Sequence, residues 1–203
     1  MNNKREHWEN IYTSKKSDEM SWTQNHPTKS LAFIQKANIS KDSAIIDIGG
    51  GESQLVDHLL KLGYTDLTVL DISEQALLRA QERLGKKAKN VNWICSDITE
   101  FKPDKKYILW HDRAVFHFLK QDEIMKYLEI ASNYVTKNLI ISTFSKEGPM
   151  KCSGLSIQQY NAEDLAILIH PEYHLLVSES ELHTTPFNTN QAFMYCLFEK
   201  AMN

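Results

Sequence analysis

Cysteine is scarce in this sequence and is not paired. The 203 residues include three cysteines, which lie far apart at Cys95, Cys152 and Cys196. An odd number without C-x-x-C spacing argues against a disulfide framework and against the usual cysteine zinc site. This cysteine usage is typical of a reducing compartment, and we expect a cytoplasmic protein.

Long apolar runs and a basic excess are also lacking. No run approaches the roughly 20 residues that a membrane-spanning helix needs, so we expect no membrane partner. The first ten residues contain no apolar stretch, so no secretory signal is expected. The 23 Lys and Arg against 26 Asp and Glu give a net charge of -3. A dedicated nucleic-acid binder needs a basic footprint, so this balance argues against one.

Glycine and proline are few, and nothing resembles a linker. Seven glycines and five prolines are scattered through the chain. Apolar residues make up 42% and charged residues 24%, which is ordinary for one folded domain. We expect residues 1–40, which are mostly polar, to form a helical cap over the functional site. Residues 41–203 are expected to form the rest of a single structural domain.

Short apolar segments alternate with amphipathic ones along the chain. Strands are predicted at 44–48, 67–70, 91–95, 107–110 and 139–144, with helices predicted between them at 54–62, 73–84 and 122–134. This alternation predicts an α/β fold with a doubly wound, mostly parallel sheet. A helix at 161–169 precedes two strands at 173–178 and 192–198 that no helix separates. These two strands predict an antiparallel edge hairpin and bring the sheet to seven strands.

A glycine-rich loop and two acidic residues follow the first three strands. The first strand ends at Asp47, before Gly49-Gly50-Gly51-Glu52-Ser53, and Asp71 and Asp97 follow the next two strands. The carboxyl ends of parallel strands share one edge, where ligands bind. Asp71 is spaced to accept ribose hydroxyls, and Asp97 to accept from an adenine amino group. A plain turn and helix caps are the alternatives, but three acidic strand ends beside one loop favour a ligand site.

The composition of the loop separates cofactor classes. Dinucleotide loops read G-x-G-x-x-G and place a pyrophosphate at a helix N-terminus. Here the third glycine is missing and Glu52 stands in the loop, where a carboxylate would repel a pyrophosphate. The loop therefore favours a ligand without phosphates, with Asp47 placed to hold an ammonium group or to lie near a sulfonium.

Three segments resemble the first motifs of class I S-adenosylmethionine-dependent methyltransferases. They are 47–53 (DIGGGES), 70–73 (LDIS) and 96–99 (SDIT), and the resemblance covers about residues 30–200. It implies a Rossmann-like methyltransferase fold and S-adenosylmethionine as cofactor. The implied cofactor-binding residues are Asp47, Gly49, Gly50, Gly51, Ser53, Asp71, Ile72, Ser96, Asp97, Ile98 and His111.

The sequence departs from that family pattern at two places. Gly50 stands where cysteine, alanine or serine is usual, and Lys137-Asn138 replaces the usual Gly-Gly before the fifth strand. Neither change is expected to abolish cofactor binding. The second leaves open how the chain turns before that strand.

The segment after the fourth strand reads WHDRAVFHF over 110–118. It resembles a group of bacterial methyltransferases that also carry the segment CSGL, here at 152–155. In such enzymes this stretch faces the transferred methyl, so His111, Asp112 and His117 are the candidate catalytic bases. Arg113 could hold a substrate carboxylate through two parallel hydrogen bonds. A packing role for His117 and a structural ion pair of Asp112 with Arg113 are equally open.

Three N-terminal aromatic residues and two later residues are the other substrate-site candidates. Trp8, Tyr12 and Trp22 resemble the N-terminal pattern of small-molecule methyltransferases and of some lysine methyltransferases. They could wall off a site or hold a cation, or simply anchor an N-terminal helix. Cys152 could be a reactive thiol or an inert cysteine. His183 could be catalytic or a surface histidine. No metal is expected, because these residues lack a local ligand spacing.

These observations favour an enzyme that transfers a methyl group to a small molecule. Methyl transfer is an in-line displacement, so the enzyme mainly supplies position and a dry site. The alternatives are a protein lysine methyltransferase, an RNA methyltransferase and a non-catalytic module that binds S-adenosylmethionine. We expect a monomer or a weak dimer.

Overall fold

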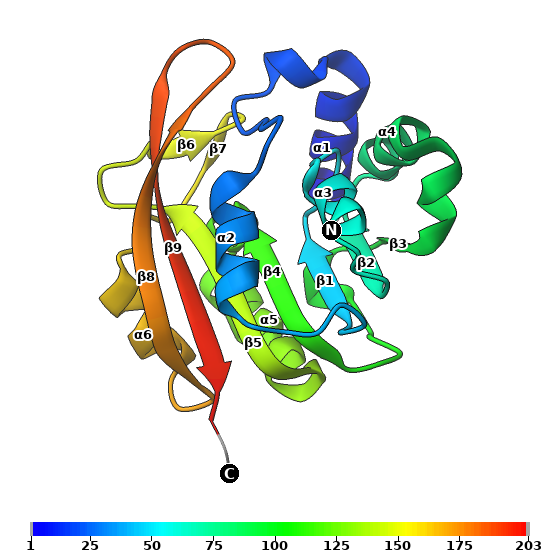
Figure 1. Ribbon diagram of the computed structural model, residues 1–203. Coiled ribbons are helices and arrows are strands. Elements are labelled where there is room, and N and C mark those ends of the chain that lie inside the picture. The colour runs from blue at the N-terminus through cyan, green and yellow to red at the C-terminus, as the bar shows by residue number, and fades with distance from the viewer. Residues whose placement is uncertain (1, 202–203) are drawn as a thin grey trace.

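A seven-stranded sheet forms the centre of the protein (Figure 1). The computed structural model describes residues 2–201. The strand order is β3-β2-β1-β4-β5-β9-β8. The strands of this sheet are β1 (Ile45–Ile48), β2 (Leu67–Asp71), β3 (Val91–Cys95), β4 (Tyr107–Arg113), β5 (Val135–Phe144), β8 (Tyr173–Thr184) and β9 (Asn190–Lys200). The first five strands run parallel and β9 pairs antiparallel with β5 and β8, so the predicted fold class is confirmed.

Helices cover both faces of the sheet (Figure 1). They are α1 (Asn2–Ser14), α2 (Thr28–Lys36), α3 (Leu55–Lys61), α4 (Glu74–Leu84), α5 (Gln121–Tyr134) and α6 (Ala162–Ile169). Side chains of α2 and α3 pack on one face, and those of α5 and α6 pack on the other. A small hairpin of β6 (Lys151–Cys152) and β7 (Leu155–Ser156) carries the CSGL segment. Helices α1 and α2 agree with the helices expected within residues 1–40.

Alternation along the strands decides which residues face which helices. Successive side chains of a strand point to opposite faces. In β4, Leu109 packs in the core with α2 and α3, whereas Trp110 packs in the core with α5 and α6. His111 and Arg113 follow Leu109 by two and four residues, and Asp112 follows Trp110 by two. The strand therefore separates His111 and Arg113 from Asp112.

Lys137 and Asn138 lie inside a strand and not in a turn. Helix α5 ends at Tyr134 and β5 begins at Val135, so no glycine turn is needed between them. The Asn138 side-chain amide donates to the Phe198 carbonyl (3.1 Å), and the Lys137 ammonium donates to the Ala37 carbonyl (3.1 Å). Both side chains thus fasten β5 to its surroundings, which accounts for their presence where the family has glycines.

The edge hairpin is longer than the sequence indicated. Strands β8 and β9 pair over eleven positions from Tyr173–Lys200 to Thr184–Asn190, well beyond the predicted 173–178 and 192–198. The outer residues of β8 alternate in exposure along an edge strand, so their apolar signal is weak.

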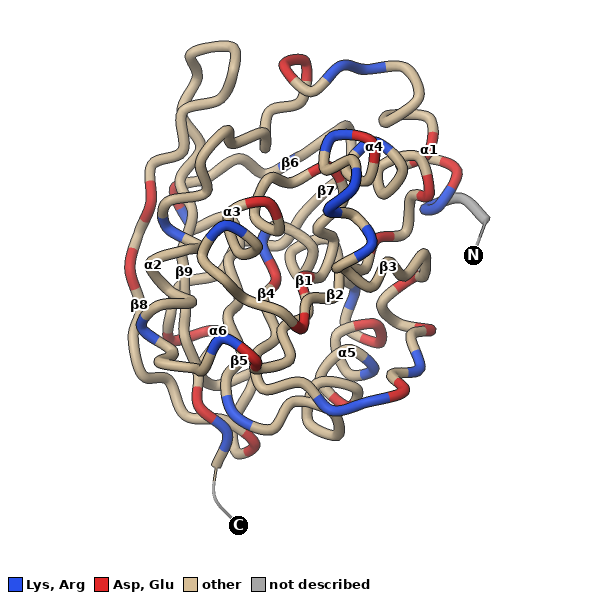
Figure 2. Tube along the Cα trace, turned by 45° about the vertical axis from the view of Figure 1, so that its right-hand side comes forward, with Lys and Arg blue, Asp and Glu red and all other residues tan. Residues whose placement is uncertain are grey.

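Charges of both signs are interspersed along the chain, and the tip of the β8–β9 hairpin carries neither (Figure 2).

No helix within residues 2–201 is both long and apolar enough to cross a membrane. No three His, Cys, Asp or Glu side chains in that range gather as a metal-ligand set.

Candidate functional site

A cavity of about 140 Å³ lies at the carboxyl ends of β1 and β4. The N-terminal segment forms its roof, and the glycine loop and β4 form its floor. Its lining includes the predicted site residues Tyr12, Trp22, Asp47, Gly49, Gly50, Ser53, His111 and Arg113, together with Ser30, Glu52 and Arg83, which were not predicted. The structure thus brings the predicted methionine-side residues and part of the predicted substrate site together.

The glycine loop needs glycine for conformation and for space. Gly51 has φ +43°, and a Cβ there would lie 2.9 Å from both the Asp71 Oδ2 and the Tyr12 hydroxyl. A Cβ on Gly50 would lie 2.7 Å from the Asp47 Oδ2. The departure at Gly50 therefore makes room for the Asp47 carboxylate.

Asp47, His111 and Ser30 form a buried hydrogen-bonded chain. Asp47 and His111 are register partners on the adjacent strands β1 and β4, and their Oδ1 and Nδ1 are 2.7 Å apart. The His111 Nε2 lies 2.9 Å from the Ser30 hydroxyl on α2, and the His111 residue is 2% exposed. In the tautomer that donates Nδ1–H to the Asp47 carboxylate, Nε2 is the atom that accepts from the Ser30 hydroxyl.

Asp71 lies at the end of β2, two residues before Ser73, the N-cap of α4. Its Oδ1 accepts from the Ser73 amide (2.8 Å), and the Ser73 hydroxyl accepts from the Ala76 amide (3.1 Å). Burial, together with the nearby Asp47 and Glu9 carboxylates, raises the pKa of Asp71 to about 7 against the lowering effect of the Ser73 amide. The buried Asp71 carboxyl suits a neutral hydroxyl donor as its partner. The contact of Asp71 with the ribose stays a prediction.

Glu9 is a site-building residue that the sequence did not reveal. Its carboxylate accepts from the Ser73 hydroxyl (3.0 Å) and from the Glu74 and Gln75 amides (2.6 and 3.2 Å). A carboxylate is favourable at a helix N-terminus because the free amides and the helix dipole attract it. Glu9 therefore fastens α1 to the start of α4 across 64 residues of sequence.

The predicted adenine-side residues lie outside the cavity. The Asp97 Oδ1 accepts from the Thr99 amide and hydroxyl (both 2.8 Å). This oxygen therefore acts as the helix cap that was the alternative interpretation of Asp97. The Ser96 amide donates to the Asp71 carbonyl, which joins the ends of β3 and β2. Arg5 of α1 donates to the Cys95 sulfur (3.0 Å). Helix α1 thus reaches over this edge, and the roles predicted for Ile72, Ser96, Asp97 and Ile98 stay predictions.

Asp112 lies on the face of the sheet opposite to the cavity. It is fully buried, and its Oδ1 accepts from the Val115 and Phe116 amides (3.0 and 3.3 Å). Burial raises its pKa to about 6. No ion pair with Arg113 forms, because neighbours in a strand point apart. The geometry supports a structural role for Asp112 in the turn after β4 and does not support the predicted base.

His117 is a core residue. Its ring stacks on Phe144 at 4.6 Å, and its Nδ1 accepts from the Phe144 amide (3.2 Å). Burial, and secondarily the Arg113 charge, lower its pKa to about 3. A histidine that stays neutral inside the core fits the packing alternative and not the predicted base.

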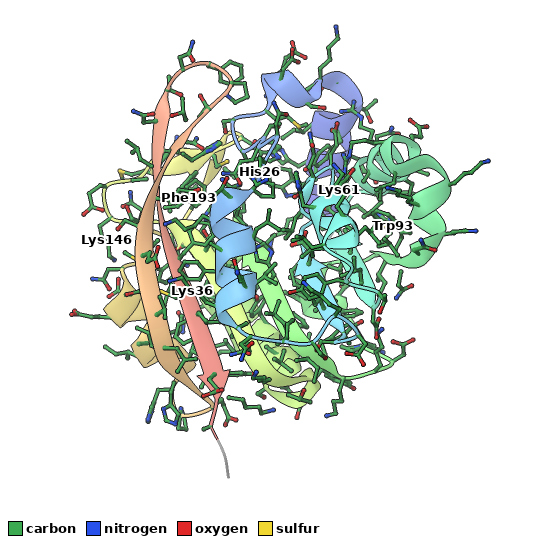
Figure 3. All side chains as sticks on the ribbon, viewed as in Figure 1. His26, Lys36, Lys61, Trp93, Lys146 and Phe193 are labelled. Carbon is green, nitrogen blue, oxygen red and sulfur yellow. The ribbon has the colours of Figure 1, made fainter. Side chains whose placement is uncertain are left out.

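Arg113 faces the cavity with a partly satisfied guanidinium. Its Nε donates to the Tyr195 hydroxyl (2.9 Å) and its Nη1 donates to the Trp22 carbonyl (3.1 Å). The guanidinium carbon lies 4.6 Å from the centre of the Phe193 ring on β9, which Figure 3 labels on the α2 side of the sheet. The cap thus rests on Arg113 through the Trp22 backbone.

His183 and Cys152 are both buried beside this arginine. The His183 Nε2 lies 2.7 Å from the Ser21 carbonyl, so the surface alternative for His183 does not fit. Burial and the Arg113 charge lower the pKa of His183. Burial raises the pKa of Cys152, which fits an inert thiol.

The N-terminal aromatic residues pack edge to face with one another. The Trp22 ring centre lies 5.8 Å from that of Trp8 and 6.3 Å from that of Tyr12. Trp8 also contacts Phe118 at 5.2 Å. Tyr12 and Trp22 line the cavity and Trp8 does not. The aromatic cluster therefore closes the site and also anchors the N-terminal helix, so both of these interpretations describe it.

The sequence of this chain is similar to those of known methyltransferases. The family model described as "Methyltransferase domain" matches residues 45–138, from β1 into β5. The malonyl-[acyl-carrier protein] O-methyltransferase 2 of Ilyobacter polytropus is 26% identical over 185 residues, which cover 83% of this chain and 68% of the relative. The eEF1A lysine and N-terminal methyltransferase of Mus musculus is 24% identical over 119 residues, 58% of this chain and 17% of that much longer protein.

Solved structures share the fold over nearly the whole chain. A structure concerned with the conversion of a disulfide bond into a thioacetal group during echinomycin biosynthesis superimposes with a TM-score of 0.79 at 15% identity, covering 98% of this chain and 94% of that one. The Burkholderia thailandensis 1,6-didemethyltoxoflavin-N1-methyltransferase gives 0.69 at 15% identity, covering 99% and 85%. The matched methyltransferase domain, the methyltransferase relatives and the shared fold together support a class I S-adenosylmethionine-dependent methyltransferase.

Proposed function

We propose that this methyltransferase acts on a small-molecule acceptor enclosed beneath its N-terminal cap. The observation that carries the proposal is the roof of the cavity. Tyr12 and Met20 of the cap are buried against the core, and the Trp22 carbonyl is held by Arg113. A polypeptide or RNA acceptor would have to displace this packed segment altogether, whereas a small molecule needs only a local shift of it. The cap, residues 1–40, is part of one structural domain with residues 41–203 in this proposal.

The cofactor-binding residues offer groups that match S-adenosylmethionine. The buried Asp47 carboxylate suits the ammonium of the methionine part, and Gly49, Gly50 and Gly51 leave room for it. Asp71 suits the ribose hydroxyls, and Ser53 lies in the same loop. On the adenine side, we propose contacts with Ile72, Ser96, Asp97 and Ile98. The bound cofactor supplies an electrophilic methyl group on a sulfonium.

The residues of the chain would orient the acceptor and handle its proton. Burial of the cavity excludes water, which leaves positioning as the main source of rate. His111 is the candidate base, because Asp47 fixes its Nδ1–H and leaves Nε2 as the accepting atom. Nε2 now accepts from Ser30, so an acceptor hydroxyl or ammonium must replace that hydroxyl. Asp47 would then stabilise the imidazolium.

Two measurements test this function. Isothermal titration with S-adenosylhomocysteine should show binding, and its absence would remove the enzyme proposal. A lysate separated into protein, RNA and low-mass fractions is then incubated with the enzyme and tritiated-methyl cofactor. We expect label in the low-mass fraction; label confined to protein or to RNA would overturn the small-molecule proposal.

A protein lysine methyltransferase is the second candidate. The relatives of this chain include eEF1A lysine and N-terminal methyltransferases and a human N-terminal Xaa-Pro-Lys N-methyltransferase that is 27% identical over 100 residues. Aromatic residues such as Trp8, Tyr12 and Trp22 can bind a lysine ammonium on their faces. Here the rings pack on one another edge to face, which favours a wall over a cation box.

A further inference from the structure

Arg113 is a cation that the described chain does not neutralise. Its Nη2 is buried and has no hydrogen-bond partner among the described residues. No Asp or Glu oxygen of the described side chains lies within 4.0 Å of it. An unpaired charged donor in a protein interior is costly, so such a group commonly serves a ligand. The other two arginines that touch the cofactor loop, Arg79 and Arg83, are paired with Glu52 and Asp57.

The surroundings of Arg113 hold it rigidly in place. The Tyr195 hydroxyl fixes its Nε, the Trp22 carbonyl fixes its Nη1, and the Phe193 ring lies under the guanidinium plane. A preorganised guanidinium loses little freedom when it binds a planar oxyanion. Burial raises the pKa of Tyr195, the Arg113 charge lowers it, and Glu181 on β8 raises it. One Glu181 oxygen is buried without a partner, but Glu181 forms no ion pair with Arg113 within 4.0 Å. Among the described side chains, no carboxylate therefore pairs with the Arg113 charge.

Arg113 lines the cavity that holds the candidate base. Arg113 and His111 are two residues apart on β4 and point to the same face. Both line the same cavity as Asp47 and Gly49. An acceptor whose one end is held at Arg113 would therefore present another part to the methyl-transfer site.

We propose that Arg113 binds a carboxylate of the methyl acceptor, so that the acceptors of this enzyme are small organic acids. This inference rests on the proposed small-molecule function. The carboxylate takes the free Nη2–H, and its second oxygen accepts from the second N–H of Nη1, so that the Trp22 carbonyl stays in place and the parallel two-bond geometry of arginine with carboxylates forms.

The test uses the full chain loaded with S-adenosylhomocysteine. Acetate, malonate and benzoate are the probes, and neutral benzamide is the matched control ligand. Titration calorimetry compares wild type with Arg113→Met and with Lys36→Met, which removes an exposed cation that Glu179 already pairs and that does not line the cavity. We expect at least one carboxylate to bind wild type and Lys36→Met at least tenfold more tightly than Arg113→Met, with no such difference for benzamide. The proposal fails when no carboxylate binds wild type, or when Arg113→Met binds them within twofold.

The cofactor itself also carries a carboxylate that Arg113 could bind. A second comparison distinguishes this carboxylate from that of the acceptor. 5′-Methylthioadenosine lacks the amino-acid part of S-adenosylhomocysteine. If Arg113 binds the acceptor, Arg113→Met leaves the affinity for both nucleosides within threefold. A tenfold loss for S-adenosylhomocysteine alone would assign Arg113 to the cofactor and overturn the proposal.

Two further controls keep the outcomes distinct. Arg113→Lys keeps the buried charge and removes the two-bond fork, so we expect carboxylate affinity between those of wild type and Arg113→Met. This variant decides the question if circular dichroism shows that Arg113→Met is unfolded. Failure of wild type to bind S-adenosylhomocysteine contradicts the proposed function, whereas normal cofactor binding without carboxylate recognition contradicts only this inference.

Discussion

At the scale of single residues, two buried carboxyls have raised pKa values for the same physical reason. Desolvation penalises the ionised form of Asp71 and of Asp112, and neither carboxyl has a cationic side chain hydrogen-bonded to it. They differ in location, since Asp71 borders the glycine loop and Asp112 lies in the opposite core. Their substitutions should therefore have different consequences.

Replacing Asp71 with Asn should change how stability depends on pH. The folded pKa of about 7 exceeds the unfolded value near 3.8, so the folded state holds the proton longer as pH rises. Asp71 thus lowers the free energy of unfolding progressively between about pH 4 and 7, and Asn removes this loss. Relative to wild type, Asp71→Asn should gain about 2–3 kcal/mol between pH 5 and 7.5 in urea unfolding. Parallel pH profiles of the two proteins would contradict the raised pKa.

Replacing Asp112 should mainly affect folding. Asp112→Ala leaves the Val115 and Phe116 amides without their acceptor, which should lower the free energy of unfolding by about 2–3 kcal/mol. Asp112→Asn keeps an acceptor oxygen and should cost less. Methyl transfer per folded molecule should change less than tenfold in Asp112→Asn, measured with tritiated cofactor. A hundredfold loss in a folded Asp112→Asn variant would restore the base role.

At the scale of elements, α1 contacts the start of α4 and the end of β3, beside the predicted adenine-side residues. Helix α1 is anchored by Glu9 at the start of α4, by Arg5 at Cys95 and by an ion pair of Lys4 with Glu123 on α5. The cavity of about 140 Å³ is below the roughly 300 Å³ of small-molecule sites. Binding of cofactor and acceptor therefore requires the cap to shift.

Removing the Glu9 anchor should loosen α1. Glu9→Ala leaves the first amides of α4 without this acceptor, so we expect a loss of about 1 kcal/mol in stability. Hydrogen exchange should speed up in α1 and in the first turn of α4. Glu6→Ala is the matched control, because Glu6 is exposed on the same helix and its removal should change stability by under about 0.5 kcal/mol. Equal exchange in the two variants would show that Glu9 does not hold α1.

At the scale of the whole molecule, one sheet joins every part of the core. Strand β4 lies between β1 and β5, and it carries side chains into the clusters on both faces. The cap adds a third, small cluster of Ile11, Tyr12, Met20 and Ala76 that ties α1 to α4. The cap and the sheet are therefore expected to unfold together.

Thermal unfolding should show one transition that S-adenosylhomocysteine shifts upward. At 100 times its dissociation constant, a ligand that binds only the folded state adds about 2.7 kcal/mol. For a chain of this size, that should raise Tm by about 5–10 °C in calorimetry. A separate early transition for the cap, or an unchanged Tm, would contradict the single-domain arrangement or the cofactor site respectively.

Much of the fold was predictable because its signals are local. Apolar strand runs, the helix N-cap at Ser73 and the glycine loop each span fewer than a dozen residues, and the five central strands lie where the pattern predicted them. Strand alternation would also have separated Asp112 from His111, since it needs only the apolar partners Leu109 and Trp110. The length of the β8–β9 hairpin was not predictable, because the added part of β8, residues 179–184, is held by pairing with β9 and not marked by its composition.

The sequence by itself determined the α/β architecture, the loop with its acidic neighbours and the kind of cofactor that the loop resembles. These features depend on residue order over short spans. Only the tertiary structure decided that His111 joins Asp47 to Ser30, that Glu9 fastens the cap, and that Arg113 lacks a counterion. Each of these joins elements far apart in the chain, so its geometry depends on packing that no local pattern records.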